Sequence, residues 1–146
     1  MAISVLLVDD EETFVQTLAK RLTLRRFNVY TATRTERIFA ILDENLIDVV
    51  VLDVKMPDLD GIEATKTIRT TYPLVEVILL TGHASMEASL EGMKMGAFDY
   101  LLKPVNIDEL VYKIEDAHRK KELREEKIRR LRDQTEDEGD EVRPTD

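Results

Sequence analysis

Residues 6–14 read LLVDDEETF, and a short apolar run ends there in four consecutive acidic residues. Neighbouring like charges repel each other, and each carboxylate loses favourable solvation when it leaves water. The stretch therefore has two interpretations. Either the acids only open a helix at the surface, or a site at the end of a buried segment receives a cation.

The same succession of an apolar run and an amphipathic segment is repeated five times along the chain. Runs that are almost entirely Val, Ile and Leu are typical of strands covered on both faces of a parallel sheet. Strands that alternate with helices predict an α/β fold with a parallel sheet, right-handed crossovers and helices on both faces. The expected strands are ISVLLV (3–8), NVYTA (28–32), DVVVLD (48–53), VEVILLT (75–81) and FDYLL (98–102).

Local signals mark some of the helix ends between these strands. TRTE (33–36) has the Ser/Thr-x-x-Glu form of a capping box, and NIDE (106–109) resembles one with Asn as the cap. Gly96 stands where a helix is expected to end.

Polar residues stand at the carboxyl ends of four expected strands. In a parallel sheet these ends open on one edge, where ligands bind near the point at which the strand order reverses. Asp53 follows the apolar run VVVL, where an acid without a cationic partner would be poorly solvated. The candidate site at this edge comprises Asp9, Asp10, Asp53, Thr81 and Lys103.

Composition limits the classes of function. The 146 residues are enough for one domain with a core, and they contain no cysteine for a disulfide, a thiolate metal site or a nucleophile. No apolar run approaches the roughly 20 residues of a membrane span, and the start lacks the features of a signal peptide. We therefore expect a cytoplasmic location and no membrane partner. The net charge of −9 argues against direct binding of nucleic acid.

Charge separates the C-terminal part from the rest. Residues 119–132 hold eight basic and three acidic residues, a net of +5, whereas 133–146 hold one basic and seven acidic residues, a net of −6. Neither segment has the composition of a second core. We therefore expect one domain over 1–120 and a charged extension over 121–146.

The pattern VDDEE…LDVKMPDLDG…TGHA…GAFDYLLKPV resembles the receiver domain of two-component response regulators, over about residues 1–120. It is most similar to the receivers of regulators that work at sigma-54 promoters. The resemblance implies a single flavodoxin-like (βα)5 domain with strand order 2-1-3-4-5. It also implies a partner, a sensor histidine kinase whose phosphohistidine donates a phosphoryl group.

In the resemblance, Asp53 is the phosphoacceptor and the cofactor is Mg²⁺. Asp10 and Asp53 would be direct ligands of the metal, the backbone carbonyl of Lys55 a third, and Asp9 would act through a water. Such a set of oxygen ligands suits a hard cation that keeps several waters. Glu11 and Glu12 are explained by the first helical turn, where acids suit the helix dipole.

The resemblance assigns two more side chains to the phosphoryl group and one to a switch. Lys103 would pair with a phosphoryl oxygen as a point charge, and the Thr81 hydroxyl would donate to another. Thr81 would then move, and Tyr100 would fill the vacated space. The output face would be formed by the helix around 86–94, the strand 98–102 and the helix from Ile107, used for a partner or a homodimer.

Alternative functions are an enzyme and a binding module. A haloacid-dehalogenase-like phosphatase also uses an Asp nucleophile, Mg²⁺, a Thr or Ser and a Lys, but it has Asp-x-Asp after its first strand, where this chain has DDEET. A module that has lost phosphotransfer would not need the complete set of site residues. The chain is therefore interpreted as a phosphoacceptor and not a turnover enzyme, either in its own right or as the receiver of a longer transcriptional regulator.

The last helix is predicted to begin near Ile107 and to run to about residue 132, with 133–146 mobile. Its apolar positions follow a 3-4 heptad spacing, which allows a dimer through this helix. Lys121 and Arg124 interrupt that apolar row. We expect any dimer to be strengthened by phosphorylation of Asp53.

Overall fold

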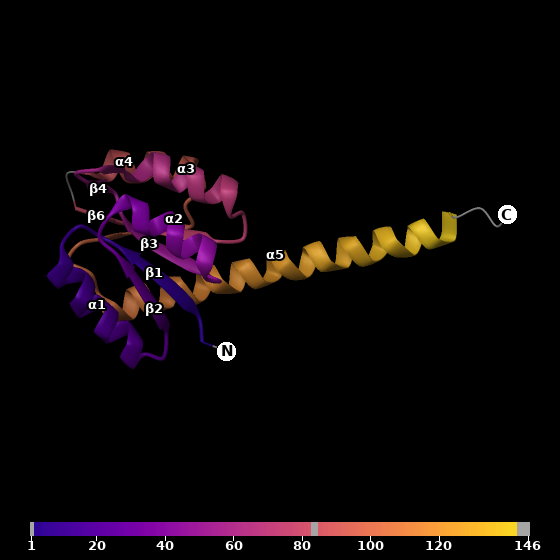
Figure 1. The fold of residues 1–146 in the computed structure, drawn as a ribbon, viewed down its shortest axis with the longest axis horizontal. Helices are drawn as coiled ribbons and strands as arrows, with labels where there is room; N and C mark the ends of the chain where they lie inside the picture. Colours follow the sequence, from indigo (N-terminus) through magenta and orange to yellow (C-terminus); the bar gives the residue numbers. More distant parts are fainter. Residues whose placement is uncertain (1, 83–84, 143–146) are drawn as a thin grey trace.

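A computed structural model describes residues 2–82 and 85–142 of the chain (Figure 1). Its main sheet has five parallel strands in the order β2-β1-β3-β6-β7. This is the expected 2-1-3-4-5 order of the five long strands, so the predicted flavodoxin-like fold is confirmed. The strands are β1 (Ser4–Val8), β2 (Asn28–Ala32), β3 (Val49–Asp53), β6 (Glu76–Thr81) and β7 (Asp99–Leu102).

Helices cover both faces of the sheet (Figure 1). The helices are α1 (Glu12–Leu24), α2 (Thr35–Glu44), α3 (Gly61–Thr71), α4 (Met86–Lys94) and α5 (Ile107–Val142). Alternate residues of each buried strand enter two separate cores. Leu6 and Val8 of β1 pack with α2 and α3, whereas Val5 and Leu7 pack with α1 and α5. Every strand that carries a site residue is therefore held from both sides.

A two-stranded antiparallel hairpin of β4 (Lys55–Met56) and β5 (Leu59–Asp60) follows the end of β3. The apolar periodicity did not predict it, because its strands have only two residues each. The hairpin returns the chain to α3 beside its own start. The Gly61 amide donates to the Val54 carbonyl at 3.2 Å, and a Cβ on Gly61 would lie 2.6 Å from the same oxygen.

Two of the three predicted helix ends are correct. The Asn106 side chain accepts from the Glu109 amide at 3.0 Å, and Gly96 takes a φ of +111° just after α4. The capping box at 33–36 was wrong, because α2 begins at Thr35 with no side-chain cap. Thr35 is instead tied to another loop, since its hydroxyl donates to the Asp58 carbonyl at 3.3 Å.

Helix α5 crosses one face of the sheet and continues as a long isolated helix (Figure 1). It ends at Val142, so the predicted end near residue 132 was too early. Residues 133–138 contain no Gly or Pro, and the helix continues through Gly139 to Val142. Residues 143–146 of the segment predicted to be mobile lie outside the described residues.

The first turns of the extension are fixed to the core by ion pairs, which we call the α5 clamp (Asp48, Glu76, Lys121 and Arg124). The Lys121 ammonium pairs with Asp48, and the Arg124 guanidinium lies 3.1 Å from Glu76. Asp48 and Glu76 lie at the amino ends of β3 and β6. The clamp is therefore at the opposite end of the sheet from the candidate site.

None of the helices in the described part of the chain combines the length and the apolar character that a bilayer crossing needs.

Candidate functional site

Three carboxylates meet at the carboxyl edge of the sheet. Asp9 and Asp10 follow β1, and Asp53 is the last residue of the neighbouring strand β3. One oxygen from each carboxylate lies within 4.8 Å of the others. Asp9 and Asp53 are buried, whereas Asp10 is exposed. The edge thus holds two carboxylates away from water and a third open to it.

Asp9 also has a local role in the turn that starts α1. Its Oδ1 accepts a hydrogen bond from the Glu11 amide at 3.0 Å. Glu12 lies in the first turn of α1, where a negative charge is favoured by the helix dipole. The interpretation of the acidic run as the start of a helix therefore holds for Asp9 and Glu12, and the interpretation as a cation site stays a prediction.

Lys103 brings one positive charge to this edge. Its Nζ lies 2.8 Å from Asp9 Oδ2 and 3.6 Å from Asp53 Oδ2. Its backbone amide donates to the Thr81 carbonyl at 2.8 Å, which ties the end of β7 to the end of β6. Burial by itself lowers the pKa of Lys103, but the hydrogen bond to Asp9 and the charge of Asp53 raise it overall. The ammonium therefore stays protonated between the two buried carboxylates.

The surroundings of Asp53 disfavour the charged form of its carboxyl group. Burial raises the pKa of its carboxyl above the usual value, and the negative charge of Asp9 raises it further. Lys103 and a backbone hydrogen bond from the Lys55 amide, at 3.4 Å, act in the opposite direction without reversing the shift. One ammonium does not balance three nearby carboxylates, so this carboxyl group would gain from further positive charge.

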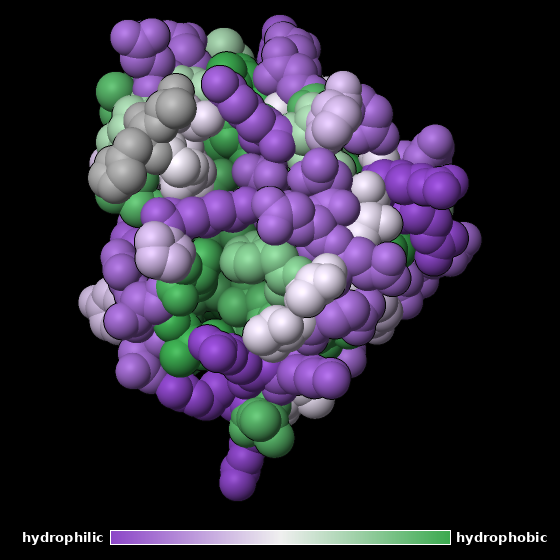
Figure 2. Space-filling model, turned by 90° about the vertical axis from the view of Figure 1, so that its left-hand side faces the viewer, coloured by the Kyte–Doolittle hydropathy of each residue, from purple (hydrophilic) through white to green (hydrophobic). Residues whose placement is uncertain are grey.

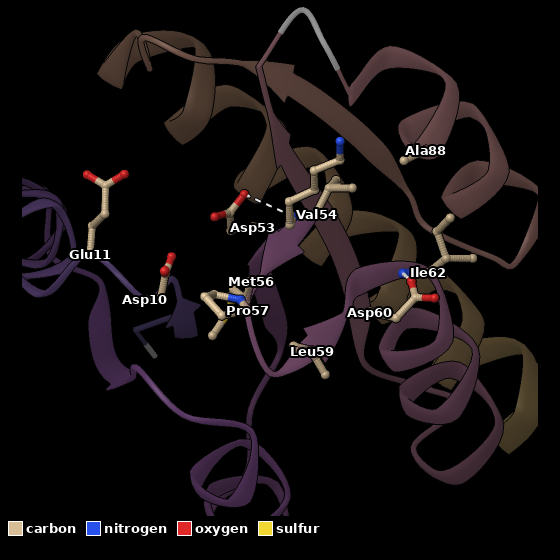
Figure 3. Close-up of a pocket in the computed structure, with 11 residues that line it drawn as sticks. Asp10, Glu11, Asp53, Val54, Met56, Pro57, Leu59, Asp60, Ile62 and Ala88 are labelled. Atoms are coloured by element: carbon tan, nitrogen blue, oxygen red, sulfur yellow. Dashed lines mark hydrogen bonds between the residues drawn. The ribbon is translucent and has the colours of Figure 1, made fainter.

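An open pocket lies between this edge and α4 (Figure 3). Asp10 and Asp53 lie at one side of it, and Ala88 of α4 lies on the other. The β4–β5 hairpin contributes the apolar wall, with Met56 and Leu59. Viewed from the end where α1 and α4 begin, the surface is mostly hydrophilic around a hollow with a hydrophobic lining (Figure 2). The pocket thus leaves the Asp53 side chain within reach of a reacting group.

Thr81 and Tyr100 lie on the neighbouring strands β6 and β7. Thr81 is buried at the end of β6, and its hydroxyl donates to the Gly82 carbonyl at 3.0 Å. Asp53 is paired in register with Leu80, so Thr81 comes one residue beyond it. Tyr100 of β7 is partly buried and packs against the core of α2, α3 and α4. These positions are compatible with the predicted roles of both residues, which remain predictions.

The donor set fits a divalent cation of the Mg²⁺ type. Oxygen ligands, a negative surplus and an open side for water are the properties that such an ion requires. Lys55 begins the β4–β5 hairpin, and its backbone amide donates a hydrogen bond to the Asp53 carboxylate. Sequence reasoning identified the acids, Thr81 and Lys103 at this edge, but not the hairpin that forms the wall of the pocket.

Comparisons with known proteins agree with this geometry. The model of the response regulator receiver domain matches residues 5–115. A putative response regulator NtrX-like protein of Rickettsia felis is 35% identical over 128 residues, which are 86% of this chain and 27% of that protein. The regulatory protein AtoC of Escherichia coli K12 is 34% identical over 127 residues, 87% of this chain and 27% of that protein.

Among solved structures, a response regulator receiver domain protein from Clostridium thermocellum has a TM-score of 0.79 and 37% identity. The match covers 83% of this chain and 98% of the chain in that structure. The chain spans about a quarter of the length of the curated relatives named above. The haloacid dehalogenase alternative is left without support. Family model, relatives and fold together mean that this chain belongs to the receiver domains of two-component response regulators.

Proposed function

We propose that Asp53 is the residue that accepts a phosphoryl group from the phosphohistidine of a sensor histidine kinase. The observation that carries this assignment is the cluster of three carboxylates within 4.8 Å, joined by the Lys103 ammonium, at an open edge of the sheet. In the transfer, the bond between phosphorus and the imidazole nitrogen breaks and a bond between phosphorus and an Asp53 oxygen forms. Asp53 is suited to this role because it borders the pocket and is only partly neutralised.

Mg²⁺ is the proposed cofactor. Asp10, Asp53 and the Lys55 carbonyl would hold it directly, and Asp9 would hold it through a water. When bound, the ion would offset the negative charge that develops on the phosphoryl oxygens. The chain itself supplies the pre-arranged carboxylates, of which Asp10 is the most accessible from solvent.

Lys103 and Thr81 would bind the transferred group. The ammonium already lies 3.6 Å from Asp53, so it needs only a small movement to reach a phosphoryl oxygen bonded there. The Thr81 hydroxyl would exchange its bond to the Gly82 carbonyl for another phosphoryl oxygen. Tyr100 would then occupy the space that Thr81 leaves, which gives two states biased by phosphorylation.

The output of this switch would be the face formed by α4, β7 and α5. Large apolar side chains are exposed there, with Leu90 53%, Leu102 37% and Tyr112 68% accessible. Such a face supports binding of a downstream protein or a second copy of the chain. We infer no direct contact with nucleic acid or membrane, a cytoplasmic location, and no turnover of a substrate beyond the domain's own phosphorylation and dephosphorylation.

A second possibility concerns the larger context. Because the chain spans about a quarter of relatives such as AtoC, it also fits the receiver unit of a longer transcriptional regulator. The chemistry proposed for Asp53 is the same in both cases.

The test uses the small phosphodonor phosphoramidate with Mg²⁺ and intact-mass measurement. We expect a gain of one phosphoryl group that disappears in Asp53→Asn and when EDTA replaces Mg²⁺. Full labelling of Asp53→Asn would mean that another residue is the acceptor. Continuous release of phosphate from a phosphomonoester by the pure protein would contradict the assignment as a non-turnover protein.

A further inference from the structure

The Lys103 ammonium has a third neighbour that the proposed chemistry does not use. The ring of Phe14, in the first turns of α1, has its centroid 4.8 Å from Lys103 Nζ. A cation within about 6 Å of an aromatic centroid is attracted by the ring quadrupole. Phe14 is partly buried and packs against the core formed by α1 and α5, so its ring is held in place.

The other two neighbours of the ammonium would change partners in the proposed reaction. Asp9 and Asp53 are 2.8 Å and 3.6 Å from Nζ, and both are among the groups proposed to hold Mg²⁺. If these carboxylates held Mg²⁺, their attraction for the ammonium would weaken. The Phe14 ring binds no metal and has no titrating group, so its attraction for Lys103 is unaffected. A lysine has a flexible stem, and without a fixed neighbour its charge would spread over many positions.

We propose that Phe14 is a positioning residue for phosphoryl transfer, whose ring keeps the Lys103 ammonium beside Asp53 while the carboxylates exchange partners. This inference rests on the proposed function of Asp53 and Lys103. It assigns a role to an α1 side chain that reaches the reacting group only through Lys103.

The alternative explanation is that Phe14 serves only to pack the core. The chain offers a matched control for it. Phe98 is also partly buried against the same core, and the Lys120 ammonium lies 5.4 Å from its ring centroid. Phe98→Leu therefore makes the same chemical change in the same core. It removes a contact between a ring and the Lys120 ammonium, and leaves the contact of Lys103 with Phe14 in place.

The first measurement needs no phosphorylation. In proton–carbon spectra of the full chain, the Lys103 ε-methylene protons should be shifted upfield by the ring current of Phe14. We expect this shift to vanish in Phe14→Leu, to persist in Phe14→Tyr, and to be unchanged in Phe98→Leu. An unshifted methylene in the wild-type protein would overturn the contact, whatever the outcome of phosphorylation.

The second measurement is the initial rate of Asp53 phosphorylation by phosphoramidate and Mg²⁺, in which a phosphorus–nitrogen bond is exchanged for a phosphorus–oxygen bond and ammonia leaves. Phe14→Leu should slow the reaction by about 2- to 30-fold, the range of a cation–π contact. Phe14→Tyr, which keeps the ring, should restore the rate to within about twofold. Phe98→Leu should stay at the wild-type rate.

Equal rates for Phe14→Leu and Phe98→Leu, or a Phe14→Tyr variant as slow as Phe14→Leu, would overturn the proposal in favour of packing alone. Thermal unfolding of each variant checks folding, and Phe14→Met replaces Phe14→Leu if the latter is unfolded. A wild-type protein that takes no phosphoryl group on Asp53 would contradict the proposed function instead. The ring-current measurement would then still decide the contact itself.

Discussion

At the scale of single residues, the burial of the Asp53 carboxyl makes the stability of the fold depend on pH. Its pKa lies above the ordinary 3.8 because of burial and the charge of Asp9. The folded protein therefore binds this proton more tightly than the unfolded chain. The protonated Asp53 carboxyl therefore contributes to the free energy of unfolding at low pH. This contribution is lost as the pH rises from about 3.8 through the folded-state pKa.

Asp53→Asn should remove this loss. Without Mg²⁺, we expect the variant to have a Tm a few degrees above the wild type at pH 7, and the difference to shrink as the pH falls through the folded-state pKa of Asp53 toward about 3.8. Thermal unfolding between pH 3 and 8 measures it. A variant that is less stable than the wild type at neutral pH would mean that the Lys103 pairing outweighs the burial of Asp53.

A metal prediction concerns Asp10, the exposed member of the carboxylate cluster. Asp10→Asn removes a charged oxygen ligand and should weaken Mg²⁺ binding by about tenfold or more, with slower phosphorylation at limiting metal. Calorimetric titration with Mg²⁺ gives the affinity. Glu12→Gln is the control within the same acidic run, because Glu12 is explained by the first turn of α1. Wild-type affinity in Asp10→Asn would contradict the ligand assignment.

At the scale of elements, the β4–β5 hairpin depends on one glycine. A Cβ on Gly61 would lie 2.6 Å from the backbone oxygen of Val54, which cannot move without shifting the residue after Asp53. Gly61→Ala should therefore cost about 1–3 kcal/mol of unfolding free energy. In Gly92→Ala the new methyl would lie 2.3 Å from a terminal carbon of the Leu79 side chain, and no backbone atom is among its near contacts.

Urea unfolding of the two alanine variants tests this difference. We expect Gly92→Ala to remain within about 1 kcal/mol of the wild type, because added helix propensity offsets the repacking. If Gly61→Ala is no less stable than Gly92→Ala, the close approach of the hairpin is not a constraint on the fold.

The α5 clamp explains the two charged residues that interrupt the apolar row of the last helix. Leu110, Ile114 and Ala117 are buried against the sheet, and the row then continues with Lys121 and Arg124, which pair with acids of the core. Glu76 is fully buried and is also 3.6 Å from Arg69. The charges therefore bind the extension to its own domain and do not face a partner helix.

Arg124→Gln should destabilise the chain, because the buried Glu76 would keep only the weaker contact with Arg69. We expect a loss of about 2–3 kcal/mol, somewhat less than for a fully broken buried pair. Hydrogen exchange of the amides around 121–132 should increase. Arg130→Gln is the control, since Arg130 pairs with Glu126 on the exposed side of the helix and should contribute less than about 0.5 kcal/mol. Equal effects of both variants would contradict the clamp.

At the scale of the whole molecule, the features that follow from pattern were predictable and those that follow from tertiary contact were not. Short apolar runs that alternate with amphipathic segments predicted the five long strands, and strand order then collected Asp9, Asp53 and Lys103 at one edge. The partners of Lys121 and Arg124 lie far away in sequence, so the pattern could not assign them. The ring of Phe14 beside Lys103 was hidden for the same reason, because these two residues also lie far apart in the sequence.

The clamp also bears on how two copies of the chain would associate. Beyond Arg124, in the part of α5 whose side chains the structure describes, the row has two apolar members, Ile128 and Leu131, which are 42% and 52% exposed. Two such positions are too few for a stable coiled coil. The face of α4, β7 and α5 exposes Leu90, Leu102 and the ring of Tyr112. We therefore expect phosphorylation to promote a dimer through this face, with the extension adding little.

Sedimentation velocity of the wild type, with and without a phosphoryl mimic at Asp53, measures this association. Because apolar contact on the face should dominate, Leu90→Ala with Tyr112→Ala should weaken the phosphorylated dimer by about tenfold or more. Ile128→Glu with Leu131→Glu should change it by less than about threefold. A larger effect of the extension variant would move the contact to the isolated part of α5. A monomer in both states at high concentration would rule out the dimer, and the exposed face would then be left for a different protein.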